Sequence, residues 1–228
     1  MNRVLKKILF AAALALLLIP MTPAHGQAGA QDEQFRYRWQ LRNVIGTVAG
    51  LFLPNQGEGS LTFTRTNGHL KSELLITSPK SREGEYFRYG SEIDPRTLQP
   101  IRAWSSYAWR GETKSKSEEI VQEGVLDIAA GIFAIRRDPP TKARRMEIWS
   151  EGKIYPVVVY PKGIEKRKMP DGMVQTRHYS IRGVEIPGRR KWKGKLDLWL
   201  ATDQAATPVE ILISRSLTDV RLQLTSGF

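Results

Sequence analysis

Apolar and polar residues alternate along most of this chain, and the alternation predicts β-strands. In residues 35–41 (FRYRWQL), aromatic and apolar residues alternate with arginine and glutamine, so each set faces one side of a strand. The pattern recurs in about twelve short segments up to residue 224. Asn67-Gly68 and the segment 170–172 (PDG) suit the backbone reversals between strands. We therefore expect an all-β fold in which an antiparallel sheet curls into a barrel-like or half-barrel sandwich.

One segment departs from the two-residue period. Residues 125–137 (VLDIAAGIFAIRR) carry apolar residues at helical spacing, with Leu126, Ala129 and Phe133 on one face. The segment predicts a single short helix that ends before Pro139-Pro140. A buried strand that ends at the same prolines is the alternative.

The first 30 residues have the layout of a cleavable signal peptide. Basic residues precede the apolar run 8–19 (ILFAAALALLLI), and small residues follow it, with cleavage expected before Gln27 or Gln31. The run is shorter than the roughly 20 apolar residues that a membrane-spanning helix needs, although an uncleaved anchor is the alternative. Because no internal repeat or linker divides residues 31–228, we expect them to form one exported domain.

The sequence contains no cysteine, which excludes disulfides, thiolate metal sites and lipid attachment at a cysteine. We therefore expect a periplasmic protein that is not a lipoprotein. Beyond residue 30 the histidines are His69 and His178, and no metal-binding, nucleophile-elbow or phosphate-loop motif is present. Asp94 is interpreted as a turn former and Asp127 as a first-turn helix residue. We expect no catalytic residue, cofactor or metal, and a non-enzymatic role is favoured.

Positive charge is concentrated in one segment. The formal net charge is +12, and residues 136–195 hold 17 basic and 6 acidic residues. Such an excess favours an anionic partner, although a solvated face that keeps the protein in solution is the alternative. Because an exported protein rarely meets nucleic acid, we expect an anionic lipid or membrane surface as the partner and no nucleic acid. The pattern predicts no particular oligomeric state.

Two groups of side chains are candidates for contact with such a partner. In the segment 188–195 (GRRKWKGK), cations surround a tryptophan, which suits a lipid headgroup boundary. Aromatic residues on expected strands form the second group, since the aromatic face of a curled sheet can hold an apolar ligand. The candidates are Arg189, Arg190, Lys191, Trp192 and Lys193 in the first group, and Trp39, Trp104, Tyr107 and Trp109 in the second. The alternatives are a solvated hairpin with the tryptophan folded back on the sheet, and aromatic residues that belong to the core.

Several short motifs follow one another along nearly the whole of residues 31–228. They are Phe35-x-Tyr37-x-Trp39, Ser91-Glu92-Ile93-Asp94-Pro95-Arg96-Thr97-Leu98-x-Pro100, the segment 125–136, Leu198–Asp203 ahead of Pro208-Val209, and Val220–Leu224. In this order they resemble an exported bacterial family, domain of unknown function 3108. The resemblance implies an envelope location and a curved antiparallel β fold similar to that of periplasmic lipoprotein carriers, and it implies no established activity. The helical stretch departs somewhat from the family, in which an aromatic residue is expected near Gly131-Ile132.

Three functional hypotheses follow. The first, which we favour, is a non-catalytic envelope protein that binds an amphipathic anionic component such as a lipid, with the curved sheet holding the apolar part and the basic segment the anionic part. The second is a hydrolase that acts on envelope polymers, for which the compartment is the only argument. The third is an outer-membrane β-barrel, suggested by the alternation in residues 220–224 and the final Phe228, although no continuous outward apolar band is evident.

Overall fold

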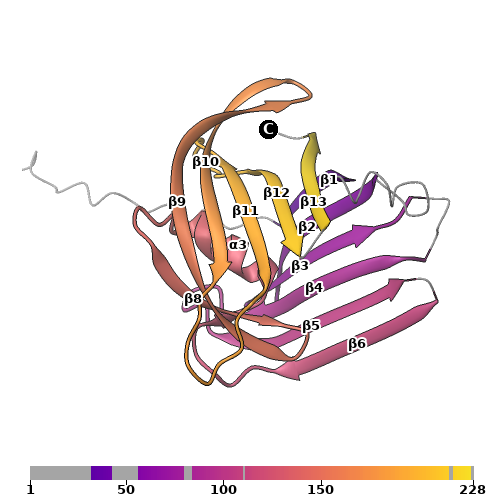
Figure 1. Ribbon diagram of the computed structural model, residues 1–228, viewed down its shortest axis with the longest axis vertical. Coiled ribbons are helices and arrows are strands. Elements are labelled where there is room, and N and C mark those ends of the chain that lie inside the picture. The colour runs from indigo at the N-terminus through magenta and orange to yellow at the C-terminus, as the bar shows by residue number, and fades with distance from the viewer. Residues whose placement is uncertain (1–31, 43–55, 80–83, 110, 216–217, 227–228) are drawn as a thin grey trace, which may run out of the picture. The chain divides into compact units, whose positions relative to one another are not determined.

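The computed structural model describes residues 32–42, 56–79, 84–109, 111–215 and 218–226, which form thirteen strands and one helix (Figure 1). The expected signal peptide, its cleavage positions and Phe228 lie outside the described residues. Within the described part of the chain, no helix is long and apolar enough to cross a membrane.

Short turns connect most of the consecutive strands. In chain order the elements are β1 (Glu33–Leu41), β2 (Gln56–Thr66), β3 (His69–Thr77), β4 (Tyr86–Ile93), β5 (Pro100–Trp109), β6 (Glu112–Glu119), β7 (Val125–Leu126), α3 (Ile128–Arg137), β8 (Arg144–Ser150), β9 (Lys153–Met169), β10 (Gly172–Gly183), β11 (Gly194–Ala201), β12 (Pro208–Arg215) and β13 (Thr218–Ser226). Asn67 and Gly68 join β2 to β3 with φ angles of 51° and 82°. These positive values are the ones that a type I′ turn needs, so the expected hairpin is confirmed.

All thirteen strands belong to one sheet, in the order β6-β5-β4-β3-β2-β1-β13-β12-β11-β10-β9-β8-β7. Neighbouring strands are antiparallel except β7 and β8, which are parallel. Strand β1 pairs with both β2 and β13 and so joins the two halves of the chain. The edge strands β6 and β7 do not pair with each other, so the sheet curls without closing. An all-β fold with a curled, almost entirely antiparallel sheet and one short helix is therefore confirmed.

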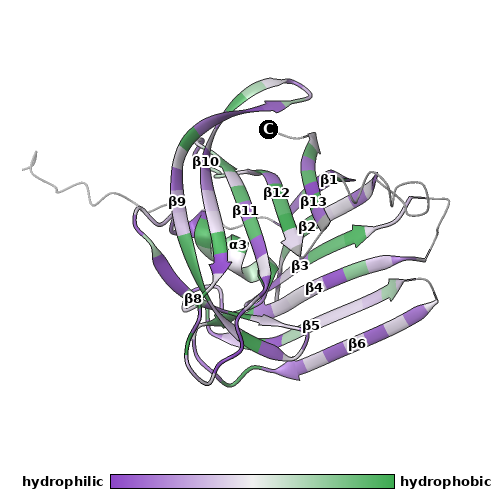
Figure 2. Cartoon of the chain, in the orientation of Figure 1, coloured by the Kyte–Doolittle hydropathy of each residue, from purple (hydrophilic) through white to green (hydrophobic). Residues whose placement is uncertain are grey.

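Helix α3 lies on the inner face of the curled sheet and forms the centre of the core. Seven of its ten residues are buried, which matches its hydrophobic colouring in Figure 2. The sheet contributes alternate residues of its strands, among them the fully buried Leu61, Leu74, Leu198 and Ile211. Full burial of one such side chain stabilises the fold by about 1.5–3 kcal/mol.

The helix begins later than the sequence pattern predicts. Val125 and Leu126 form strand β7, Asp127 is the N-cap residue, and the helix starts at Ile128. The Asp127 carboxylate accepts hydrogen bonds from the backbone N–H groups of Ala129 and Ala130, both at 3.0 Å. Our interpretation of Asp127 as a first-turn residue is therefore corrected. An extended cap residue can satisfy the free N–H groups of the first turn directly.

In the described residues, side chains rather than backbone hydrogen bonds connect β6, at one end of the sheet, with β7 and β8 at the other end. Trp149 of β8 donates a hydrogen bond from Nε1 to the Glu118 carboxylate of β6 at 3.1 Å. Ala103, Ile120 and Val125 pack with Trp149 in a small apolar cluster beside this contact. Strand β6 is exposed along its whole length and carries hydrophilic residues (Figure 2), which hinders pairing with a strand of another chain.

Candidate ligand-binding site

A cavity of about 440 Å³ lies beside the N-terminal end of α3, on the inner side of the curled sheet. It is lined by Tyr89 of β4, Ile128 of α3, Ser150, Glu151 and Tyr155 around the β8–β9 turn, Arg190, Lys191, Trp192, Lys193 and Gly194 ahead of and at the start of β11, and Ile213 and Ser214 of β12. The helix fills one part of the sheet's interior, and the cavity occupies space beyond the helix N-terminus. We call this space the main cavity.

A smaller cavity of about 40 Å³ adjoins the main cavity, since Tyr89 and Glu151 line both. Its remaining lining comes from Ser105, Ser106 and Tyr107 of β5 and from Lys114 and Lys116 of β6. The two lysines face the inside of the curl because they pair with Tyr107 and Ser105 across the β5–β6 ladder. We call this space the side cavity.

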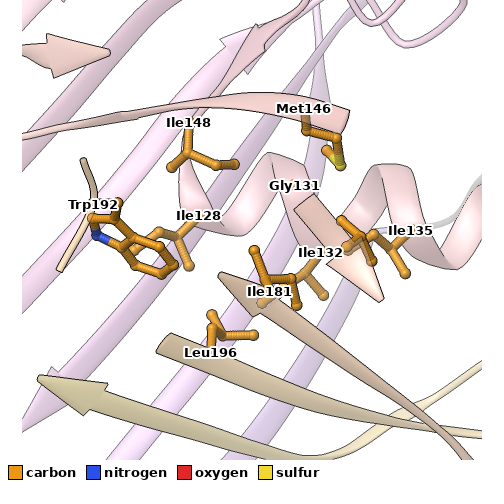
Figure 3. A pocket seen from close by; sticks show the side chains of 10 residues that line it. Ile128, Gly131, Ile132, Ile135, Met146, Ile148, Ile181, Trp192 and Leu196 are labelled. Carbon is orange, nitrogen blue, oxygen red and sulfur yellow. The ribbon is translucent and has the colours of Figure 1, made fainter. Parts of the chain in front are cut away.

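An apolar pocket of about 20 Å³ lies between the helix and the sheet, and it shares Ile128 and Trp192 with the main cavity (Figure 3). Its other lining residues are Gly131, Ile132, Ile135, Met146, Ile148, Val159, Ile181 and Leu196. The indole of Trp192 therefore lies between the apolar interior and the more polar main cavity.

Two glycines allow Trp192 to lie this close to the sheet. A Cβ atom at Gly194 would be only 2.7 Å from Cε2 of the indole, and one at Gly183 would collide with the Trp192 backbone. The indole packs against the hydrophobic core and is partly buried. Trp192 is thus folded back on the sheet, as one of the sequence-based alternatives expected, and it lines the cavity from that position.

The cations next to Trp192 differ in their contacts. Arg190 and Lys193 are exposed at the main cavity and form no ion pair with another described residue. Lys191 lies 3.8 Å from the Glu185 carboxylate, and both side chains are more than half exposed, so this pair contributes little. Arg189 instead binds the Glu147 carboxylate, and this hydrogen bond raises the pKa of the guanidinium. Arg189 is not among the lining residues of the main cavity.

The predicted aromatic residues separate into three locations. Trp39 is buried in the core, where its Nε1 donates a hydrogen bond to the Thr77 carbonyl at 2.7 Å. Trp104 lies on the outer face of β5, because the alternation along the strand directs its side chain to the other face from those of Tyr107 and Trp109. The Lys71 ammonium lies 5.6 Å from the centroid of the Trp104 ring. Tyr107 lines the side cavity, and Trp109 lies next to Phe87 with 5.6 Å between ring centroids.

Sequence reasoning missed most of the lining of the two cavities, including its charged and aromatic members Tyr89, Lys114, Lys116 and Tyr155. The alternation of residues 112–117 places Lys114 and Lys116 on one face of a strand, so part of this signal was present. That Tyr155 and Tyr89 line the same cavity depends on contacts between distant strands, which no local pattern contains.

The remaining candidate side chains have structural partners. Asp94 accepts hydrogen bonds from the backbone N–H groups of Arg96 and Thr97, which lower its pKa and support its interpretation as a turn former. His69 lies 3.1 Å from a Glu92 oxygen, and His178 lies 3.1 Å from an Asp197 oxygen. In the part of the chain that the structure describes, no group of three or more histidine, cysteine or acidic residues is arranged to hold a metal ion.

Comparison with known proteins adds little to this picture. No protein-family model matches the sequence, and no curated protein gives a significant match. One similar solved structure is described as a beta-barrel-like protein of domain of unknown function DUF1849 from Brucella abortus, with a TM-score of 0.45 and 8% sequence identity over 85% of this chain and 95% of that one. None of these comparisons names a function for the chain.

Proposed function

We propose that this protein binds an amphipathic anionic molecule, such as a lipid of the bacterial envelope, in the main cavity. The observation that carries the proposal is one cavity that combines an aromatic and apolar lining with cations that form no ion pair within the described part of the chain. Trp192, Tyr155 and Ile213 offer apolar contact, while Arg190 and Lys193 offer positive charge at the same opening. The volume of about 440 Å³ lies in the range of about 300–1,000 Å³ that is typical of ligand pockets.

The lining supports one orientation of the ligand. Apolar atoms of the ligand would lie against Ile128 and the Trp192 indole, next to the apolar pocket of Figure 3. The anionic group would lie at Arg190 and Lys193, where the cations can remain hydrated in the unbound state. Lys114 and Lys116 add positive charge in the adjoining side cavity, and the acidic residue Glu151 lines both cavities.

The location of the protein is part of the proposal. A periplasmic protein, exported by the signal peptide that the first 30 residues predict, would meet anionic amphiphiles at the membrane surface. The resemblance to domain of unknown function 3108 agrees with this location and names no ligand. Because the sequence contains no recognised catalytic motif, we propose that the main cavity binds its ligand without catalysis.

The test uses dansyl-undecanoic acid below its critical micelle concentration and follows its fluorescence as protein is added. The wild-type protein should bind the acid more tightly than its uncharged methyl ester. In the double variant Arg190→Gln/Lys193→Gln, the dissociation constant for the acid should rise about tenfold, since each cation contributes up to about 1 kcal/mol at an exposed site. The ester should bind this variant and the wild type equally.

The matched control is Arg65→Gln/Lys142→Gln, which removes two exposed cations away from the cavities. This control should bind the acid with wild-type affinity. Equal affinity of the wild-type protein for acid and ester, or an equal loss of affinity in both double variants, would contradict the proposal.

A further inference from the structure

The hairpin of β9 and β10 extends beyond the neighbouring strands and curves at its far end (Figure 1). The curve begins at a break in the β9–β10 register between His178 and Tyr179. Gly163, on the opposite strand at this break, has a φ of +104°, a value that side chains rarely allow. Beyond the break, residues 164–169 pair with residues 172–177 in an unbroken ladder.

One face of this outer part of the hairpin is held firmly against the rest of the sheet. The guanidinium of Arg167 lies 3.9 Å from the ring centroid of Trp199, whose Nε1 donates a hydrogen bond to Glu165. Gln223 of β13 donates a hydrogen bond to the Lys168 carbonyl at 2.6 Å. Met169, near the tip, is only 4% exposed. Several independent contacts therefore fix the orientation of the hairpin.

The opposite face of the same segment is open to solvent. It carries three cations and two large apolar side chains, and all six of its residues are exposed. They are Ile164, Lys166 and Lys168 of β9, which pair with Arg177, Gln175 and Met173 of β10. Ile164 is 60% exposed and Met173 is 61% exposed. We call these six residues the hairpin face.

No acidic residue on the hairpin face balances its positive charge. None of its six residues is acidic, and its cations form no ion pair with another described residue. Glu165 points to the opposite side, where it contacts Trp199, and Asp171 lies in the turn at the tip. Exposed apolar side chains among uncompensated cations are the combination that an anionic bilayer surface accommodates.

We propose that the hairpin face docks on the surface of an anionic lipid bilayer, an interaction separate from ligand binding in the main cavity. The three cations would lie at headgroup phosphates, where each contributes about 1 kcal/mol. Ile164 and Met173 would enter the boundary between headgroups and acyl chains, where burial of apolar area adds to the binding. Because the opposite face is fixed on Trp199 and β13, the backbone of the hairpin is already ordered before binding.

The test is co-sedimentation of the protein with vesicles of phosphatidylcholine, alone or mixed with phosphatidylglycerol. Wild-type protein should bind the mixed vesicles, bind the neutral ones far less, and dissociate as the salt concentration rises. The variant Lys166→Gln/Lys168→Gln/Arg177→Gln should lower the partition coefficient about a hundredfold, the effect of losing three contributions of about 1 kcal/mol. The variant Ile164→Ser/Met173→Ser should lower it severalfold.

Two controls match these variants. Arg65→Gln/Arg96→Gln/Lys142→Gln removes three exposed cations elsewhere, and Val121→Ser removes an apolar side chain that is 92% exposed. Both should sediment like the wild type. Negligible binding to mixed vesicles, equal binding to both vesicle types, or equal losses in controls and hairpin variants would overturn the proposal.

Different results would contradict the proposal of ligand binding in the main cavity and the proposal of membrane docking. Both hairpin variants should bind monomeric dansyl-undecanoic acid with wild-type affinity, because none of the substituted residues lines the main cavity. Loss of vesicle binding together with retained acid binding supports a docking surface distinct from the cavity. Loss of acid binding in the hairpin variants would overturn that distinction.

Discussion

Asp197 of β11 is a buried carboxylate on the face of the sheet opposite the helix. Its side chain is 4% exposed, with His178 Nε2 at 3.1 Å and Lys195 Nζ at 2.5 Å. Burial by itself would raise the pKa of Asp197, but hydrogen bonds from His178 and Lys195 outweigh this effect and hold the pKa well below its usual range. Asp197 is therefore ionised at neutral pH, and its contact with His178 stabilises the pairing of β10 with β11.

We expect the contribution of Asp197 to stability to disappear in acid. Its pKa is lower in the folded protein than the value of about 3.9 in an unfolded chain, so the stabilisation is complete above that value and decreases as the pH falls below it. The variant Asp197→Asn should lower the free energy of unfolding by about 1–3 kcal/mol at neutral pH and by less near pH ~3. Urea unfolding at a series of pH values measures this difference. The exposed Asp171→Asn serves as the control, and a difference for Asp197→Asn that is constant with pH would contradict the expectation.

Gly194 determines where the Trp192 indole can lie. A methyl group at this position would be 2.7 Å from Cε2 of the ring, so Gly194→Ala should push the indole out of its place between the apolar pocket and the main cavity. We expect Gly194→Ala to weaken binding of dansyl-undecanoic acid about as much as Trp192→Ala does. Titration of both variants measures the effect. Wild-type affinity in Gly194→Ala would show that the indole position does not matter for binding.

At the scale of elements, the start of α3 depends on a buried polar cluster. The Asp127 carboxylate caps the helix and also accepts hydrogen bonds from the Ser91 hydroxyl at 2.5 Å and the Ser72 hydroxyl at 3.4 Å. Burial raises the pKa of Asp127, while the hydrogen bonds from Ser91 and the helix N–H groups act against this rise. The cluster joins the helix to β3 and β4 and so positions Ile128 at the cavity.

The variant Asp127→Ala should lower the free energy of unfolding by about 2–3 kcal/mol, because it removes the cap and leaves buried donors unsatisfied. Asp127→Asn should cost less, since an amide oxygen can still accept from the helix N–H groups. Chemical denaturation measures both effects. The control is Asp138→Ala at the other end of the helix, where the side chain is 83% exposed and its pair with Arg144 contributes at most about 1 kcal/mol. Equal losses for Asp127→Ala and Asp138→Ala would contradict the role of the buried cap.

Local patterns were sufficient to predict most elements and their faces. The alternation in residues 35–41 correctly assigned Tyr37 and Trp39 to the inner face, and Asn67-Gly68 correctly predicted a hairpin. The helix boundary was less accurate because Val125 and Leu126 are apolar at a spacing that suits either element. Only their pairing with Glu147 and Ile148 of β8 makes them a strand.

At the scale of the whole molecule, the candidate site could be predicted in part. The composition of residues 188–195 indicated cations around Trp192, and Arg190, Lys191, Trp192 and Lys193 do line one cavity. These four residues line the same cavity as Tyr89 because β1 pairs with β13 and the sheet curls. Such contacts connect residues far apart in sequence, so the local alternation of polar and apolar residues cannot predict them.

The unpaired edges of the sheet also determine how readily the molecule can adapt its interior. A closed barrel widens only if a ladder of backbone hydrogen bonds breaks, at a net cost of about 1 kcal/mol for each bond. Here, side-chain contacts such as that of Trp149 with Glu118 connect β8 to β6, next to the wall where Lys116 packs over Gly152. We therefore expect the wall beside the two cavities to shift without the loss of a backbone ladder, so that the proposed binding site can accept ligands of different width.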